Sequence, residues 1–110
     1  MELIAVVTTV ASRDEARAIA ASLVERGLVA CAQISEIESF YRWQRELQHE
    51  PEFRVLAKAV RERYSEVEAA IRALHPYELP EIHAFATAEV YPAYREWVEQ
   101  SCGSASSCPG

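Results

Sequence analysis

The chain has 110 residues, which is enough for one domain with a hydrophobic core of its own. Half of the residues are apolar and 25% are charged, which is the composition of an ordinary globular protein. No apolar run reaches the ~20 residues needed to span a bilayer. Eleven basic against seventeen acidic residues leave a formal net charge of −6, which disfavours nucleic acids and membranes as partners.

The first half of the chain predicts a central strand, a helix and a second strand. Residues 3–10 are apolar and β-branched on both faces, as in a strand buried within a sheet. Ser12 and Glu15 form a capping-box pattern ahead of apolar residues at helical spacing, which predicts a helix over 13–26. Residues 28–34 predict the second strand.

The middle of the chain predicts a hairpin. Apolar and polar residues alternate from residue 36 to residue 43, which extends the second strand. The polar stretch 44–52 contains Pro51 and predicts a turn, and residues 53–60 predict a third strand that pairs with the second.

The last third predicts a second helix, a fourth strand and a short terminal helix. Ser65 and Glu68 repeat the capping-box pattern, and Pro76 ends the helix because the residue before a proline leaves the helical conformation. The remaining predicted elements are a strand over 81–88, a short helix from Pro92, and a flexible Ser/Gly/Cys tail over 101–110 that follows a single domain of residues 1–100.

This order of elements, β-α-β-β-α-β with a terminal helix, predicts an α+β ferredoxin-like split βαβ fold with an antiparallel sheet. Residues 28–44 read as nearly continuous strand and would span about 55 Å if extended, far more than a globule with a radius of gyration of ~13 Å allows. The strand therefore bends near Ser35 or its hairpin protrudes. A protruding hairpin that carries Phe40, Tyr41 and Trp43 is expected to pair with another chain.

Four sequence motifs are similar to those of the CutA divalent-cation-tolerance family. They are LVACAQI (28–34), FYRWQ (40–44), LHPYELPEI (74–82) and the pair Tyr94 and Trp97. The resemblance extends over about residues 3–100 and implies a homotrimer built through the long hairpins, similar in plan to the PII signalling proteins. It also implies a role in tolerance of divalent metals and copper binding, with no secure enzymatic reaction. Arg45 stands where the family commonly has glycine, which disfavours a tight turn there.

The candidate metal ligands are His75 and His83, and the expected metal is Cu(II) or another divalent cation, weakly bound. His75 is either a ligand or a cap whose cationic form favours the helix end. His83 is either a ligand or a side chain that faces solvent or an interface. No H-x-x-H or H-x-H pair places two ring nitrogens on one face, so the local metal signal is weak and a site shared between subunits stays open.

A candidate pocket between subunits comprises Lys58, Tyr77, Glu81 and Trp97. Lys58 is a lone charge in an apolar strand, so it either points outward or lines a polar pocket. The family resemblance places Tyr77 and Glu81 in a cleft between subunits. Such a group could bind a small anion or polar ligand, or it could only fix the interface, and packing is the simpler role for Trp97.

The N-terminus favours a cytoplasmic protein, and the three cysteines give no clear site. The apolar run after Met1 is too short for a secretory signal. Cys31 is expected to be a small buried side chain, and no C-x-x-C pair indicates a zinc or thioredoxin-like site. Cys102 and Cys108 could bind a soft metal or be oxidised, although inert thiols in a tail are the simpler interpretation.

Two classes of function remain for this fold. An RNA-binding module of this fold is disfavoured because the first strand has no aromatic residue. A copper chaperone is disfavoured because the loop after that strand has no cysteine pair. An acylphosphatase-type enzyme is disfavoured because the same loop has no glycine-rich anion cradle. The preferred class is a non-enzymatic trimer that responds to metal or senses a ligand. The alternative is an enzyme of unknown reaction with its cleft at the subunit interface.

Overall fold

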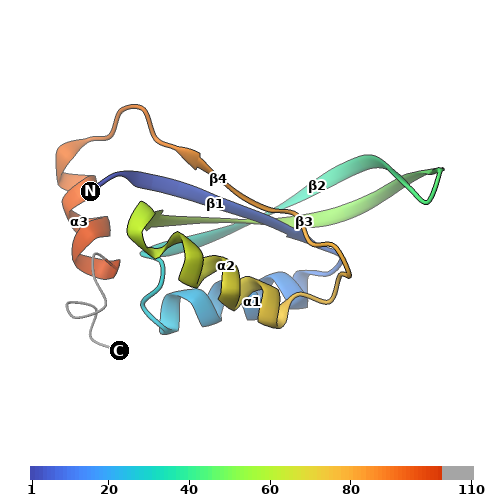
Figure 1. Ribbon diagram of the computed structural model, residues 1–110, viewed down its shortest axis with the longest axis horizontal. Helices are drawn as coiled ribbons and strands as arrows, with labels where there is room; N and C mark the ends of the chain where they lie inside the picture. Colours follow the sequence, from blue (N-terminus) through green and yellow to red (C-terminus); the bar gives the residue numbers. More distant parts are fainter. Residues whose placement is uncertain (103–110) are drawn as a thin grey trace.

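Four antiparallel strands form one sheet, and two helices cover one of its faces (Figure 1). The computed structural model describes residues 1–102. The strand order β2-β3-β1-β4 is that of the predicted split βαβ, ferredoxin-like fold. The elements are β1 (Leu3–Val10), α1 (Arg13–Glu25), β2 (Cys31–Trp43), β3 (Glu46–Val60), a 3-10 turn (Arg61–Arg63), α2 (Tyr64–Leu74), β4 (Ile82–Ala86) and α3 (Pro92–Cys102).

The hydrophobic core lies between the sheet and the helices α1 and α2. Ile4, Val6 and Val10 of the central strand β1 are fully buried together with Ile19 and Leu23 of α1. These side chains recur every second residue on the strand and every fourth on the helix, which is what brings one face of each element to the core. None of the helices within residues 1–102 is long and apolar enough to cross a membrane.

The two predicted helix starts have different outcomes. Ser12 caps α1 as expected, because its side-chain oxygen accepts a hydrogen bond from the backbone N–H of Glu15 at 3.2 Å. Ser65 does not cap α2, which already includes it and begins at Tyr64. The buried guanidinium of Arg63 instead donates to both carboxylate oxygens of Glu66 at 3.0 Å, which joins the 3-10 turn to the first turn of α2.

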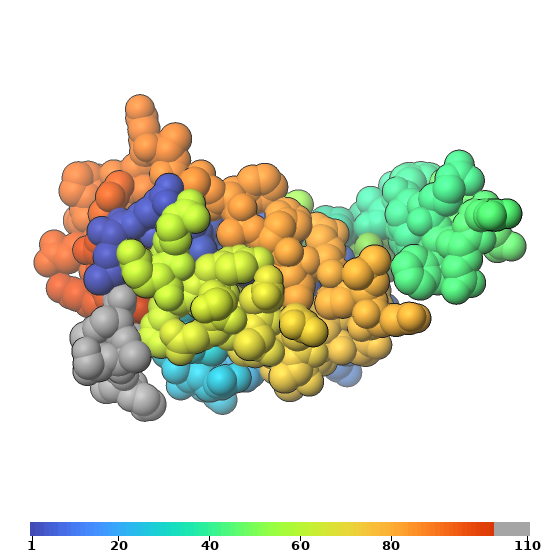
Figure 2. All heavy atoms as spheres, viewed as in Figure 1, coloured from blue at the N-terminus to red at the C-terminus, as the bar shows by residue number. Residues whose placement is uncertain are grey.

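The hairpin of β2 and β3 extends beyond the rest of the sheet. β1 pairs with β3 only over residues 53–60, whereas β2 stays paired with β3 as far as Trp43 and Glu46. Residues 37–52 therefore form a two-stranded ribbon, which we call the projecting ribbon. Figure 2 shows it as a lobe that stands out from the body of the subunit. The whole subunit, ribbon included, has extents of 45 × 28 × 20 Å. This arrangement confirms the protruding alternative for the long second strand.

The turn of the hairpin is shorter than predicted. The predicted turn over 44–52 is wrong, since β3 begins at Glu46 and only two residues connect the strands. Gln44 and Arg45 have φ values of 51° and 71°, and a two-residue turn with both values positive matches the right-handed twist of the strands. Arg45 thus forms a tight turn without glycine, and its carbonyl accepts a hydrogen bond from the guanidinium of Arg42 at 3.3 Å.

Pro51 lies inside β3 rather than in a turn. It pairs with Glu38 of β2, in the part of β3 that β1 does not reach. Proline has no N–H to donate, so it is compatible with a strand mainly where one edge lacks a neighbouring strand.

Several element ends differ from the prediction. β2 begins at Cys31 rather than at residue 28, because Leu28 donates its N–H to Leu23 at the end of α1 and packs into the core. β4 covers only 82–86 of the predicted 81–88.

The predicted tail over 101–110 begins two residues too early. α3 continues to Cys102, whose side chain is fully buried and whose carbonyl accepts a hydrogen bond from Arg63 at 3.2 Å. The rest of that tail, with Cys108, lies outside the described residues. Cys31, which was expected to be buried, is half-buried.

Candidate functional site: an acidic, aromatic cavity

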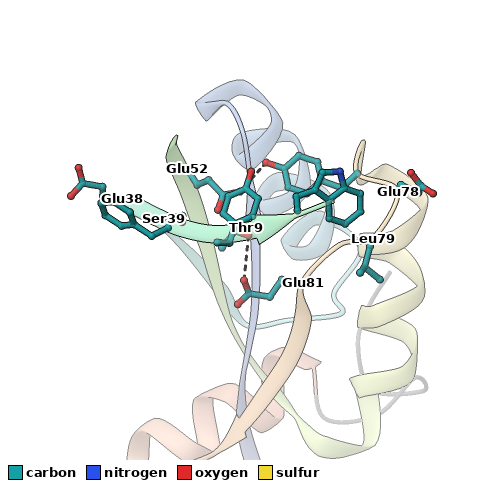
Figure 3. A pocket seen from close by; sticks show the side chains of 11 residues that line it. Thr9, Glu38, Ser39, Glu52, Glu78, Leu79 and Glu81 are labelled. Carbon is teal, nitrogen blue, oxygen red and sulfur yellow. Dashed lines mark hydrogen bonds between the residues drawn. The ribbon is translucent and has the colours of Figure 1, made fainter. Parts of the chain in front are cut away.

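A cavity of about 630 Å³ opens where the projecting ribbon leaves the sheet (Figure 3). Its walls come from the end of β1, from both strands of the ribbon and from the loop between α2 and β4. Thr9 lies at its centre in Figure 3. Four glutamates line the cavity: Glu38, Glu52, Glu78 and Glu81. Four aromatic side chains line it as well: Phe40, Tyr41, Trp43 and Tyr77.

Glu52 is the most buried of these acids, with 7% of its surface exposed. The hydroxyl of Tyr77 donates a hydrogen bond to it at 2.8 Å. Burial, followed by this hydrogen bond and the negative charge of Glu52, raises the pKa of Tyr77 well above its ordinary value of 10.0. Within residues 1–102, no basic side chain lies within ion-pairing distance of Glu52. Among the described residues, the buried carboxylate of Glu52 therefore has a neutral hydroxyl as its partner.

His75 fixes the loop beside this cavity through both of its ring nitrogens. Nε2 donates to the backbone carbonyl of Thr9 at 2.8 Å, and Nδ1 accepts the backbone N–H of Tyr77 at 3.2 Å. This pairing requires a neutral ring with its hydrogen on Nε2. His75 also follows α2 directly and donates its own N–H to Ile71, so its position is that of a helix cap, although not of a cationic one.

His83 lies nearby and pairs with Glu81. Its Nε2 is 2.8 Å from Oε2 of Glu81, and both side chains are partly exposed. The other carboxylate oxygen of Glu81 accepts the hydroxyl of Thr9 at 3.5 Å. The part of the chain that the structure describes contains no group of three or more His, Cys, Asp or Glu residues that could hold a metal ion. In one subunit, Glu81 and His83 are therefore a partly exposed pair of potential metal ligands.

A similar pair on the ribbon was missed by sequence reasoning. His49, which falls in the predicted turn, is 2.8 Å from the carboxylate of Glu38, and its ring stacks on Phe40 at 3.9 Å. The pair depends on the register of β2 and β3, in which Phe40 lies opposite His49. A hairpin register with the turn at residues 44 and 45 would have predicted it.

Lys58 and Trp97 lie in a different cluster, at the end of the sheet that α3 covers. The ammonium group of Lys58 is 3.5 Å from the side-chain oxygen of Gln33 and 6.0 Å from the ring centre of Tyr94. Tyr94 stacks on Trp97 at 5.7 Å. Its hydroxyl lies 3.7 Å from the sulfur of Cys31, and burial, followed by this hydrogen bond, raises the pKa of Tyr94 to about 12.

The four residues of the predicted pocket are therefore divided in one subunit. Tyr77 and Glu81 line the cavity at the base of the ribbon, whereas Lys58 and Trp97 belong to the cluster beside α3. A pocket that contains all four requires a second subunit, and it stays a prediction.

The residues predicted for the trimer interface lie on the projecting ribbon. Phe40 is 63% exposed and Trp43 is 41% exposed, and Tyr41 is exposed as well. These side chains are too large and too apolar to be an ordinary solvent-facing surface, so they form a candidate contact surface.

The fold and the site define a class of protein: a small ferredoxin-like α+β subunit with a projecting ribbon and an acidic, aromatic cavity at the ribbon's base. The family model for the CutA1 divalent ion tolerance protein matches residues 4–101. The chain belongs to this family, which confirms the resemblance seen in its motifs.

Individual relatives agree with this assignment over nearly their whole length. A divalent-cation tolerance protein CutA from Thermus thermophilus is 38% identical over 99 residues, which are 89% of this chain and 96% of that protein. The solved structure of CutA1 from a psychrotrophic Shewanella has a TM-score of 0.89 and 32% identity, and covers 94% of this chain and 97% of its own. A solved CutA from Archaeoglobus fulgidus, described as periplasmic, has a TM-score of 0.88, 29% identity and coverages of 91% and 98%.

Proposed function

We propose that this protein acts in tolerance of divalent cations as a homotrimer that binds Cu(II), or another divalent cation, weakly. Membership of the divalent-cation-tolerance family supports the role in metal tolerance. The observation that carries the metal-binding part is the exposed pair of Glu81 and His83. Their oxygen and nitrogen donors lie just before and within the short edge strand β4.

The proposed affinity is modest because the site is incomplete in one subunit. A carboxylate and an imidazole occupy two coordination positions, and water or a neighbouring subunit supplies the rest. Copper heads the series of divalent ions for such nitrogen and oxygen donors, so it is the first ion to test. His75 is the weaker of the two predicted ligands, since its ring nitrogens are already engaged by backbone groups.

Calorimetric titration with copper and with zinc tests this proposal. We expect His83→Ala to remove the main binding event, and His75→Ala to leave it largely in place. His49→Ala is the matched control, because it removes the same kind of imidazole from an equally short pair with a carboxylate. If His83→Ala leaves the copper isotherm unchanged, the metal site does not lie at this pair.

The projecting ribbon supports the homotrimeric part of the proposal. A two-stranded hairpin is only marginally stable by itself, and this one exposes large apolar side chains along its length. Contact with the ribbons and sheets of two further copies would bury these side chains in a closed ring, which avoids endless association. The molar mass in solution, from sedimentation equilibrium, tests this point directly.

PII-like sensing of a small ligand is the second candidate, and the cavity at the base of the ribbon supports it. A thermal-shift screen separates the alternatives, because a ligand that binds the native state raises the melting temperature. Stabilisation by a divalent metal favours metal response, and stabilisation by a metabolite favours sensing or the alternative of an interfacial enzyme.

We further propose a cytoplasmic location. The Archaeoglobus relative that is described as periplasmic makes this a point to measure. Fractionation of cells that express the full chain would decide between the two compartments.

A further inference from the structure

The outer strand β4 leaves one edge of the sheet without a partner strand. It pairs with β1 on one side, and no strand of the described chain lies on its other side (Figure 1). The N–H of Thr87 donates to the carbonyl of Leu3 at 3.0 Å, in line with the β1–β4 register. Because the N–H groups of an antiparallel strand alternate between its two sides, those of Ala84 and Ala86 point away from β1. Both therefore face the open edge.

The open edge of β4 is poorly protected against the addition of another strand. Apart from its length of five residues, β4 has none of the features that usually block such pairing, since its sequence IHAFA contains no proline and no Lys, Arg, Asp or Glu. Phe85 within the strand is exposed, and so are Leu79 before it and Tyr91 after it. Exposed apolar side chains beside an open backbone edge are typical of a surface that another chain covers.

The ribbon part of β2 is the strand of a second copy that fits this edge. In a closed ring of three copies each interface joins two different surfaces, so β4 cannot pair with β4 of a neighbour. The other outer strand of the described sheet is β2. Over residues 37–43 it lies on the projecting ribbon, beyond the reach of β1, where a neighbouring subunit can approach its outer edge (Figure 2). That part is long enough to pair with all of β4.

We infer that β4 of each subunit forms a backbone hydrogen-bond ladder with residues 37–43 of the next subunit, with the N–H groups of Ala84 and Ala86 as donors. The sheets of the copies are then continuous from one subunit to the next. The inference rests on the proposed homotrimer and adds to it the two strands that join the copies. It concerns backbone groups and does not depend on metal binding by Glu81 and His83.

Proline at position 84 tests this ladder, because it removes an outward N–H and keeps those that face β1. Ala84→Val is the matched control, since it adds similar bulk and keeps the N–H. Sedimentation velocity of both full-length variants, in the presence of a chelator so that metal ions play no part, gives the midpoint concentration of dissociation. Each of three interfaces loses a hydrogen bond in Ala84→Pro, so its midpoint should rise at least about tenfold, against less than about threefold for Ala84→Val.

Hydrogen exchange, resolved to single residues by mass spectrometry, locates the ladder without any variant. In the unaltered assembly we expect the N–H groups of Ala84 and Ala86 to exchange at least about tenfold more slowly than after dilution below the dissociation midpoint. The N–H groups of residues 37–43 that face away from β3 should show the same protection, and Ala84→Pro should remove it from both strands. If Ala84→Pro fails to fold, Ala86→Pro removes the next outward N–H of β4.

The outcomes separate this inference from the proposed homotrimer. An unaltered chain that sediments as a monomer overturns both. A trimeric unaltered protein whose midpoint is changed equally by Ala84→Pro and Ala84→Val overturns the ladder alone, because the copies then associate through side chains. Protection of β4 without protection of residues 37–43 overturns the assignment of β2 as the partner strand.

Discussion

Replacement of Trp43 by alanine tests the predicted assembly most directly. Trp43 lies on the projecting ribbon, and 41% of its surface is exposed in the single subunit. An aromatic side chain of this size has at most about 250 Å² to bury, so about 100 Å² remains available for a neighbour. At about 25 cal/mol per Å², burial of that area contributes about 2.5 kcal/mol in each subunit.

A closed trimer contains three copies of this contact, so the variant should lose about 7 kcal/mol of assembly free energy. Since every 1.4 kcal/mol changes an equilibrium constant tenfold, the trimerisation constant falls by about five orders of magnitude. The midpoint concentration of dissociation varies as the square root of that constant, and it should rise a few hundred-fold.

Sedimentation velocity over a dilution series measures this midpoint. Val24→Ala is the matched control, because Val24 is 43% exposed on α1, in the helical layer and away from the ribbon. We expect the control to leave the midpoint within threefold of the unaltered protein. A Trp43→Ala midpoint that moves less than tenfold, or an unaltered chain that is a folded monomer at micromolar concentration, would refute the reasoning.

Three further predictions concern stability, and each is measured by unfolding at one fixed protein concentration. Arg45→Gly should raise the free energy of unfolding by about 1 kcal/mol, since glycine adopts a φ of 71° without strain; no change would mean that the turn relaxes freely. Burial raises the pKa of Tyr94 from 10.0 to about 12. The stability that protonated Tyr94 contributes to the folded state is therefore complete below pH 10 and is lost as the pH rises from 10 to about 12. Tyr94→Phe should therefore flatten this alkaline decline, which an equally steep decline in the variant would contradict. Truncation after Gln100 should cost about 2 kcal/mol more than truncation after Cys102, because only the shorter chain lacks the buried thiol and the carbonyl bound by Arg63; equal stabilities would exclude that role.

Local patterns were sufficient to predict most of the fold. The apolar run of residues 3–10 and the Ser12 cap each depend on a few neighbouring residues, and both agree with the structure. The Ser65 pattern has the same letters as a capping box, but the buried ion pair of Arg63 and Glu66 decided where that helix begins. This ion pair depends on burial, which a capping motif does not contain.

The candidate site was less accessible to prediction because it depends on register. Tyr77 and Glu81 were identified, but Glu52 was assigned to a turn, and its burial follows from the continuation of β3 through Pro51. The sequence also did not show that Lys58 and Tyr77 lie in different parts of one subunit. Lys58 lies near the end of β3, whereas Tyr77, in the loop after α2, contacts Glu52 earlier on that strand. The turn prediction had made this strand seven residues too short.

The position of Pro51 has a consequence for how copies of this chain can associate. The outer edge of β3 over residues 46–52 has no neighbouring strand in the described chain, and a free strand edge is a template on which further strands can add without limit. Pro51 lacks the N–H that an added strand would need, so continuous backbone pairing along this edge is interrupted at that residue. Strand addition at this edge of β3 is thereby disfavoured. At this edge of the ribbon a further copy would find exposed aromatic side chains to pack against, but no continuous hydrogen-bond ladder to extend.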